Sequence, residues 1–286
     1  MARQPVNTAA SVRQRLLNLA RENGRDFQTL LVAFGLERLI YRLSVSPHRD
    51  SFVLKGGMLV TLWTSDPGRF TRDIDFLGFG SSDEDALRNI FASILSSDAN
   101  DGLHYGAADL TVRDIREGQI YGGKRLRTVA TLDGARIPIT IDIGFGDAIT
   151  APEYEIMYGS LLDFSPAKIR AYSPATVIAE KFQAIVALGL INGRMKDFYD
   201  LWAIPRSVEL TSSHLASAIR ATFLRRNTPV PAERPEGLTR SFAEAPGKAT
   251  QWAAFTENTR LEGSSLSETL DEIWSVLEPA IRIIER

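Results

Sequence analysis

The stretch "KGGMLVTLWTSDPGRFTRDIDF", residues 55–76, joins a pair of glycines to two aspartates that alternate along the chain. We expect strands at 51–55 and 72–77, and between them a helix at 58–64 that begins just after the glycines. Two interpretations follow. The stretch is either a tight turn beside a solvated acidic strand, or a site that holds a triphosphate and its metal ions.

The two aspartates lie on one side of the second predicted strand. Side chains alternate between faces with a period of two, so Asp73 and Asp75 share a face, and Ile74 and Phe76 point to the core. Two carboxylates this close repel each other unless a cation lies between them, and Mg²⁺ prefers oxygen ligands of this kind. A DxD pair is also common on exposed strands, so the pair alone leaves both interpretations open.

The glycines favour the phosphate interpretation. Gly56 and Gly57 have no side chains, so the backbone can approach a ligand there, and the N–H groups at the start of a helix favour phosphate. The alternative is that the pair serves only a tight turn. The sequence contains no GxxxxGK[ST] pattern, which excludes a P-loop.

A third acidic residue lies in a strand predicted at 136–145. Asp142 is on the polar face of that strand, opposite an apolar face of four isoleucines and Phe145. If this strand is a neighbour of the one that carries Asp73 and Asp75, three carboxylates converge, as in two-metal centres. Otherwise Asp142 is a single polar residue on an exposed sheet face.

Two helical segments further along the chain place charges among apolar residues. On a helix predicted at 174–189, Lys181 lies beside an apolar stripe, where it must extend its ammonium to solvent or meet an anion such as phosphate. On a helix predicted at 194–204, Asp197 lies near the core and could act as a general base. The alternative for this residue is an ion pair with Arg194 together with helix capping.

The predicted elements indicate an α+β protein with a mixed-sheet N-terminal part and a helical C-terminal part. We place these parts at 1–165 and 166–286, and we expect 227–248, rich in proline and charge, to be a long loop. The remaining predicted helices are 8–23, 27–44, 83–97, 211–226 and 264–284, and the remaining strands are 108–116, 124–132 and 167–172.

Composition limits the classes of function. The chain of 286 residues has no cysteine and three histidines, which excludes disulfides, thiolate zinc sites and cysteine nucleophiles, and argues against a histidine-rich metal site. Its net charge is −2, yet 165–226 carries nine Lys/Arg against four Asp/Glu, which reflects either random unevenness or a surface for a polyanion. No apolar run approaches the roughly 20 residues that cross a bilayer, and the N-terminus lacks a signal-peptide core, so we expect a cytoplasmic protein without a membrane partner.

Taken together, several of these stretches resemble the AbiEii-type nucleotidyltransferases. These are the toxin components of AbiE-like bacterial toxin–antitoxin systems, and the mycobacterial MenT toxins are relatives. The resemblance spans Glu22 to Trp202 and rests on ordered segments: ENGRDFQTLLVAFGLERLIYRLSVSPHRDSFVLKGGMLVTLW, RFTRDIDF, ITIDIGFGD, VIAEKFQAIV and RMKDFYDL. It implies a polymerase-β-like nucleotidyltransferase core with a mixed sheet, followed by a helical domain.

The resemblance also assigns roles to the first set of residues. Gly56 and Gly57 correspond to the motif that leads into the triphosphate-binding helix, and Asp73 and Asp75 to the carboxylates that bind Mg²⁺. Asp142 lies where a third ligand of a two-ion site is expected. Many polymerase-β-like enzymes have Gly-Ser where this chain has Gly-Gly, so a serine contact to phosphate is missing here.

A second set of residues completes the expected site. Lys181 corresponds to a contact to the NTP phosphates, and we add Lys55 and Arg72 as further phosphate-binding residues. Asp197, with Asp200 beside it, is expected to activate the acceptor hydroxyl or to orient Lys181. We therefore expect the helical domain to contribute Lys181 and Asp197 to the cleft that holds the carboxylates.

The function implied is that of an NTP-dependent, pyrophosphate-releasing nucleotidyltransferase toxin. We expect it to transfer NMP to an RNA acceptor, the tRNA 3′ end, to block translation, and to be countered by an AbiEi-like antitoxin. The alternatives are an NTP-binding module without transfer and nucleotidylation of a protein target. A hydrolytic nuclease could also use clustered carboxylates, but the glycine pair and Lys181 suit a triphosphate better.

Overall fold

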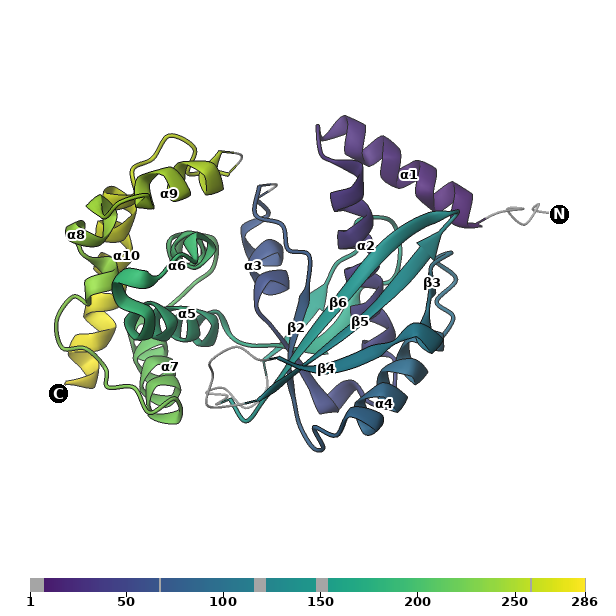
Figure 1. The fold of residues 1–286 in the computed structure, drawn as a ribbon, viewed down its shortest axis with the longest axis horizontal. Coiled ribbons are helices and arrows are strands. Elements are labelled where there is room, and N and C mark those ends of the chain that lie inside the picture. Colours follow the sequence, from purple (N-terminus) through teal and green to yellow (C-terminus); the bar gives the residue numbers. More distant parts are fainter. Residues whose placement is uncertain (1–7, 67, 116–121, 148–153, 258, 286) are drawn as a thin grey trace. The chain divides into compact units, whose positions relative to one another are not determined.

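The computed structural model describes residues 8–66, 68–115, 122–147, 154–257 and 259–285 (Figure 1). They form two compact units, which are described separately. The first takes its residues from Met1–Met58, Phe70–Gly146 and Glu153–Ala171, and the second from Leu59–Arg69, Asp147–Pro152 and Tyr172–Arg286. The main division therefore falls after 171, whereas the sequence places it after 165, and one segment near 60 belongs to the second unit.

A six-stranded mixed sheet forms the centre of the first unit, which confirms the α+β prediction. The strand order is β1-β2-β6-β5-β3, and β4 also pairs with β5. Strands β2 and β6 are parallel, and the other pairs are antiparallel. The bounds are β1 Phe52–Lys55, β2 Ile74–Gly78, β3 His104–Tyr105, β4 Thr111–Ile115, β5 Gly123–Leu132 and β6 Ala135–Phe145.

One face of this sheet packs against helices. The four isoleucines of β6 are buried, as the alternation predicts, and strands β5 and β6 pass in front of α2 (Phe27–Ser44) in Figure 1. Gly35 permits this close packing, because a Cβ there would lie 2.9 Å from Cδ1 of Ile139. Helix α2 also contacts α1 (Thr8–Glu22) and α4 (Glu84–Ser96), so it is buried on more than one side.

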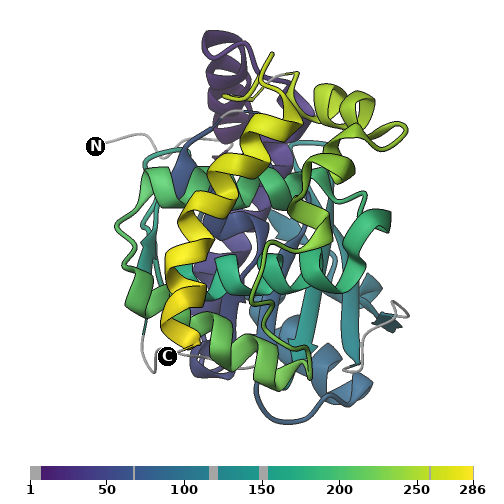
Figure 2. The same cartoon turned by 90° about the vertical axis from the view of Figure 1, so that its left-hand side faces the viewer.

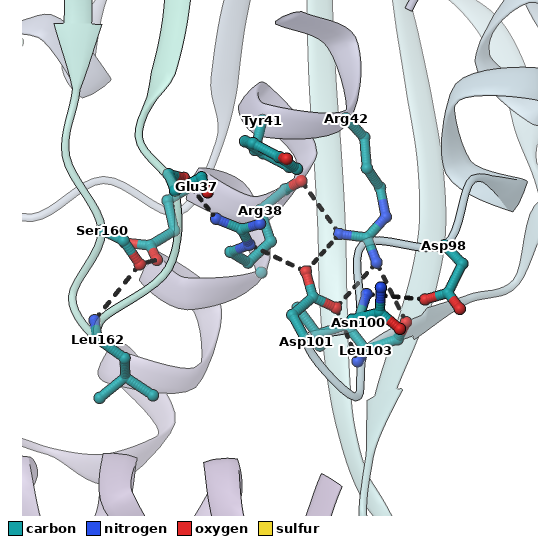
Figure 3. Close-up of polar contacts among 12 residues, drawn as sticks. Glu37, Arg38, Tyr41, Arg42, Asp98, Asn100, Asp101, Leu103, Ser160 and Leu162 are labelled. Atoms are coloured by element: carbon teal, nitrogen blue, oxygen red, sulfur yellow. Dashed lines mark hydrogen bonds and ion pairs between the residues drawn. The ribbon is translucent and has the colours of Figure 1, made fainter. Parts of the chain in front are cut away.

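A buried ion cluster joins α2 to the segment after α4 (Figure 3). Asp101 accepts hydrogen bonds from Nε of Arg38 at 2.9 Å and from Nη1 and Nη2 of Arg42 at 2.7 and 2.9 Å. None of the three side chains is more than 2% exposed. Glu37, from the same helix, accepts the backbone N–H of Leu161 at 2.8 Å, and burial raises its pKa to about 7.

Replacement of Asp101 by asparagine should lower the free energy of unfolding of the first unit by about 3–5 kcal/mol. The variant leaves the guanidinium groups of Arg38 and Arg42 buried without a counter-charge. Hydrogen exchange of the β5 and β6 amides measures this loss within the unit. Asp163→Asn is the control, because Asp163 and its partner Arg15 are 96% and 42% exposed, and exposed pairs contribute about 0–1 kcal/mol. Equal losses in the two variants would contradict the stabilising role of the cluster.

The first unit also contains short elements that the sequence does not predict. Strand β7 (Glu155–Tyr158) is one of them; it pairs with β8 (Ala167–Arg170), which the sequence does predict, at 167–172, and Leu54 of β1 bridges to the residue after β8. Strands β3 and β7 have two and four residues, too few for an alternating pattern to stand out. The predicted strand at 108–116 is shorter in the structure, and its last residue lies outside the described ones. The 3₁₀-helices of this unit are Arg49–Ser51 and Ala107–Asp109.

The second unit is helical, as the sequence predicts. The side chain of Ser173 caps helix α5 by accepting the N–H of Thr176 at 3.2 Å, and Pro174 follows the cap. Helix α5 packs against α6 and α7, and α10, the yellow helix in Figure 2, packs across α6 and α7. The bounds are α5 Pro174–Leu188, α6 Met195–Ser207, α7 Ser212–Arg225 and α10 Leu266–Ile284, and most of α3 (Gly57–Thr64) belongs here too.

The prediction of a long loop at 227–248 is wrong in part. The segment contains a 3₁₀-helix, Glu236–Leu238, and α8 (Arg240–Glu244), and it ends where α9 (Lys248–Thr256) begins. Phe242 of α8 is fully buried, so this helix is held by tertiary packing that the proline-rich sequence does not reveal. A further 3₁₀-helix, Gly189–Ile191, follows α5.

One window among the described residues, Pro174–Ile191, is long and apolar enough to cross a membrane by length and composition alone. It is not predicted from uninterrupted apolar runs, because Glu180 and Lys181 lie within it. Half of the window is buried within the protein, where α5 contacts α6 and α7. Such burial is also usual for the core helix of a folded domain.

Candidate active site

Four charged residues form one row across the sheet of the first unit. The strand register pairs Lys55 with Asp75, Asp75 with Asp142, and Asp142 with Arg125. Adjacent strands lie about 4.8 Å apart, so Asp75 and Asp142 are neighbours on one face. The sequence predicts that three carboxylates converge if the strand of Asp142 is a neighbour of the strand that carries Asp73 and Asp75. The structure shows the strands of Asp142 and Asp75 side by side.

Asp73 lies immediately before β2 and is fixed by a nearby hydroxyl. The hydroxyl of Thr71 donates to Oδ1 of Asp73 at 2.6 Å. Ile74 is fully buried between two half-buried aspartates, Asp73 and Asp75, so both carboxylates lie on the side away from the core. Thr71 is not among the site residues predicted from the sequence. Its hydroxyl, two residues before Asp73, is the only hint the sequence offers.

The glycine pair makes room for these side chains. Gly56 has a φ of +72°, and a Cβ at this position would lie 2.0 Å from Oδ2 of Asp75. A Cβ at Gly57 would lie 2.8 Å from Oγ1 of Thr71. The pair therefore does more than form a turn. Any side chain at either position would displace Asp75 or the threonine that holds Asp73.

Asp142 already has a partner in this structure. Nε and Nη2 of Arg125 donate to its two carboxylate oxygens at 2.7 and 2.6 Å. Among the described residues no group of three histidine or acidic side chains is arranged to hold a metal ion. Asp73 and Asp75 supply two carboxylates on one side of the strand, a donor set that suits Mg²⁺. For Asp142 to bind the same ion, its carboxylate would have to release Arg125.

The other predicted phosphate-binding residues of this unit lie at the ends of the two strands. Lys55 is half-buried at the end of β1 and faces Asp75 across the ladder. Arg72 is exposed, and its guanidinium lies 5.4 Å from the ring centre of Phe70. Lys55 is therefore the neighbour of Asp75 on the adjacent strand. Arg72 directly precedes Asp73 in the sequence. Each residue thus places a positive charge near one of the two carboxylates.

In the second unit, two aspartates of α6 hold Lys181 of α5. Nζ of Lys181 lies 2.7 Å from Oδ1 of Asp197 and 2.7 Å from Oδ2 of Asp200. Arg69 donates to both oxygens of Asp200 at 2.6 and 2.8 Å. Both aspartates are fully buried and Lys181 is 12% exposed. Lys181 therefore meets anions, and the alternative in which it extends to solvent is wrong.

Burial and ion pairing act in opposite directions on this cluster. Burial alone would raise the pKa of Asp200, but Lys181 and Arg69 outweigh it and lower that pKa. Burial alone would lower the pKa of Lys181, but Asp197 and Asp200 outweigh it and raise that pKa. Lys181 therefore stays an ammonium at neutral pH, which suits contact with phosphate and not proton abstraction.

Asp197 keeps one oxygen outside the hydrogen-bond network. Its Oδ1 accepts from Lys181, whereas its buried Oδ2 has no hydrogen-bond partner among the described residues. Nε of Arg194 lies 2.8 Å from Oδ2, so the ion pair expected as the alternative is present, but it lacks hydrogen-bond geometry. Asp197 thus contacts Lys181 through one carboxylate oxygen and Arg194 through the other.

Arg69 belongs to the ion cluster around Lys181 but is not predicted from the sequence. It is 4% exposed, and it bonds to an aspartate 131 positions later in the chain. No spacing rule links two residues so far apart, so only the folded structure reveals the pair. The predicted residues thus form two sets, one in each unit. That Asp75 and Lys181 face each other across one cleft stays a prediction.

Comparisons with known proteins place this geometry in a family. Residues 38–276 match the sequence profile described as "Nucleotidyl transferase AbiEii toxin, Type IV TA system". The fold is similar to the crystal structure of JHP933 from Helicobacter pylori, with a TM-score of 0.51 and 16% identity over 91% of this chain and 94% of that chain. A second crystal structure, "putative nucleotidyltransferase from H. pylori", gives a TM-score of 0.49 and 15% identity over 91% and 97%.

No protein of curated function matches the sequence. At 16% identity the JHP933 structure supports the fold alone, whereas the profile covers most of the chain and both sets of site residues. The chain therefore belongs to the AbiEii nucleotidyltransferase toxin family and is a nucleotidyltransferase.

Proposed function

We propose that this protein transfers a nucleoside monophosphate from an NTP to an RNA acceptor, the 3′ end of tRNA, in a Mg²⁺-dependent reaction. Membership of the family supplies the coarser part of this statement, namely a nucleotidyltransferase toxin that uses an NTP and has an antitoxin partner. The observation that supports the Mg²⁺-dependent transfer is the close packing of Asp75 on Gly56, with Asp73 held beside it, whereas the tRNA 3′ end as acceptor rests on the family resemblance. The carboxylates of Asp73 and Asp75 thus lie beside a backbone turn at Gly56 that a ligand can approach.

The proposed reaction forms one bond and breaks one. A hydroxyl oxygen of the acceptor bonds to the α-phosphorus, the bond from that phosphorus to the bridging oxygen breaks, and pyrophosphate leaves. Asp73 and Asp75, and Asp142 if it exchanges Arg125, would hold Mg²⁺, which supplies charge neutralisation at the α-phosphate and the pyrophosphate.

The protein's own groups would bind the triphosphate and move the proton. Lys55, Arg72 and Lys181 carry the positive charge for the phosphates, with Gly56 and Gly57 at the start of α3. Oδ2 of Asp197 would take the hydroxyl proton once its ion pair with Arg194 is exchanged for the acceptor hydroxyl. In this proposal the residues of both units serve the same reaction.

The proposed outcome for the cell follows from the chemistry of the acceptor. A nucleotide on the tRNA 3′ end occupies the hydroxyl that would receive an amino acid, so translation in the cytoplasm would stop. An AbiEi-like antitoxin would oppose this effect. The alternatives to this proposal are NTP binding without transfer and transfer to a protein.

Incubation of the protein with each α-labelled NTP, in the presence of tRNA or of total protein, should label the tRNA. We expect the label only when Mg²⁺ is present, because the carboxylates need the ion to accept a triphosphate. Gel autoradiography shows which pool carries the label. Label in protein alone would support nucleotidylation of a protein target, and shortened RNA without any NTP would support a nuclease. Either result would contradict the proposal.

A further inference from the structure

The sheet face that carries Asp75 and Asp142 continues into a group of arginines. Arg113 of β4 pairs in register with Arg125 of β5, which in turn pairs with Asp142 of β6. Two positions along β5, Arg127 pairs with Thr111. With adjacent strands about 4.8 Å apart, the row from Asp75 to Arg113 spans about 14 Å. We call Arg113, Arg125, Arg127 and Arg136 the arginine face.

The arginine face is almost free of acidic residues. Its strand positions in β4, β5 and β6 contain four arginines and a single acid, Asp142, which Arg125 already binds. Arg113, Arg127 and Arg136 are exposed. Within the parts of the chain that the structure describes, none of these three side chains forms an ion pair or a hydrogen bond. Arg113, Arg127 and Arg136 therefore present positive charge that no acidic side chain among the described residues neutralises.

The chemistry of this face suits phosphate groups better than a protein surface. Guanidinium groups bind phosphate oxygens in pairs, and exposed positive charge attracts a polyanion along its length. Residues two apart on a strand lie about 6.7 Å apart, so Arg125 and Arg127 can reach separate groups. Large apolar side chains, which anchor protein interfaces, are not among the exposed residues described on β4, β5 and β6.

We propose that the arginine face binds the phosphodiester backbone of the RNA acceptor and leads its end toward Asp73 and Asp75. The nature of the polyanion rests on the proposed function, whereas the charge of the face does not. Arg113, Arg127 and Arg136 make the phosphate contacts, and Arg125 joins the face to Asp142. Contacts of this kind position a nucleic acid and do not read its sequence.

The test is the double variant Arg113→Gln/Arg127→Gln, which removes two exposed charges and leaves the carboxylates and Arg125 in place. Binding of fluorescent tRNA is measured by anisotropy without NTP, over a series of salt concentrations. We expect the Kd for tRNA to rise about 10–100-fold and the log–log salt slope to fall by about 1.5. The control Arg240→Gln/Arg282→Gln removes the same charge from exposed positions on α8 and α10 and should change Kd less than about 3-fold.

The failure of this inference can be told apart from the failure of the proposed function. Loss of tRNA binding in Arg113→Gln/Arg127→Gln, with unchanged NTP binding, supports the arginine face even if wild type transfers no NMP to RNA. Efficient transfer to tRNA by both wild type and this variant, with the same Kd, overturns the inference and keeps the proposed function. Equal, arginine-dependent binding of poly-glutamate and tRNA would point to an acidic protein and overturn it too.

Discussion

Asp75→Asn should reduce NMP transfer by about 10³-fold or more while the first unit stays folded. Asparagine has nearly the same shape as aspartate, so it fits the space that Gly56 leaves beside β2. It lacks the negative charge that holds Mg²⁺. The proposed ion site would then have only the carboxylate of Asp73 in place of the two carboxylates of Asp73 and Asp75. The rate is measured with α-labelled NTP and tRNA under single-turnover conditions, and folding by hydrogen exchange of the β5 and β6 amides.

The matched control is Asp114→Asn. Asp114 is an exposed aspartate of β4, in the same sheet, where it pairs with Lys124. We expect this variant to transfer NMP at nearly the wild-type rate, because its carboxylate lies outside the row of Asp75 and Asp142. If Asp75→Asn retained more than about a tenth of the activity, Asp75 would not be an essential metal ligand.

Lys181→Met should be the most damaging substitution in the second unit. It removes the ammonium that Asp197 and Asp200 share and leaves the two buried carboxylates with Arg69 and the half-exposed Arg194 as their remaining counter-charges. We expect the free energy of unfolding to fall by about 3 kcal/mol and transfer to be lost. All four tryptophans belong to the second unit, so their fluorescence in a urea titration reports its stability.

A stability loss alone would not show a role in the reaction, so two further variants separate the effects. Lys196→Met removes an exposed lysine of the same helix pair and should change neither stability nor transfer. Lys181→Arg keeps the charge and should recover most of the stability, while the bulkier guanidinium displaces the phosphates and keeps transfer at least about 10-fold below wild type. Wild-type transfer by folded Lys181→Met would contradict the phosphate-binding role.

Much of the sheet can be predicted from the sequence, because alternating residues define strand faces. The isoleucines of β6 identify its buried face, and the Asp133-Gly134 turn identifies the hairpin to β5. These patterns place Asp142 on the polar face but do not tell which strand lies beside it. The parallel pairing of β2 with β6 joins residues nearly seventy positions apart, and local pattern carries no information on such a pairing.

The Arg125–Asp142 and Arg69–Asp200 ion pairs are the part of the site that could not be predicted from the sequence. The sequence places Lys181 and Asp197 beside apolar helix faces, and the family resemblance links the two, but their contact is made by the packing of α5 on α6. Arg125 offers no signal, because an arginine on a polar strand face is ordinary, yet it occupies both oxygens of Asp142. Arg69 likewise meets Asp200 only in the folded chain.

The most direct test of the account is transfer of α-labelled NMP to tRNA by wild type and by Asp75→Asn, each with Mg²⁺ and with EDTA. The account predicts label on tRNA, with one pyrophosphate released for each nucleotide added, only for wild type with Mg²⁺. Equal labelling by Asp75→Asn, or equal labelling in EDTA, would contradict the assignment of Asp73 and Asp75 as the metal-binding centre of a nucleotidyltransferase.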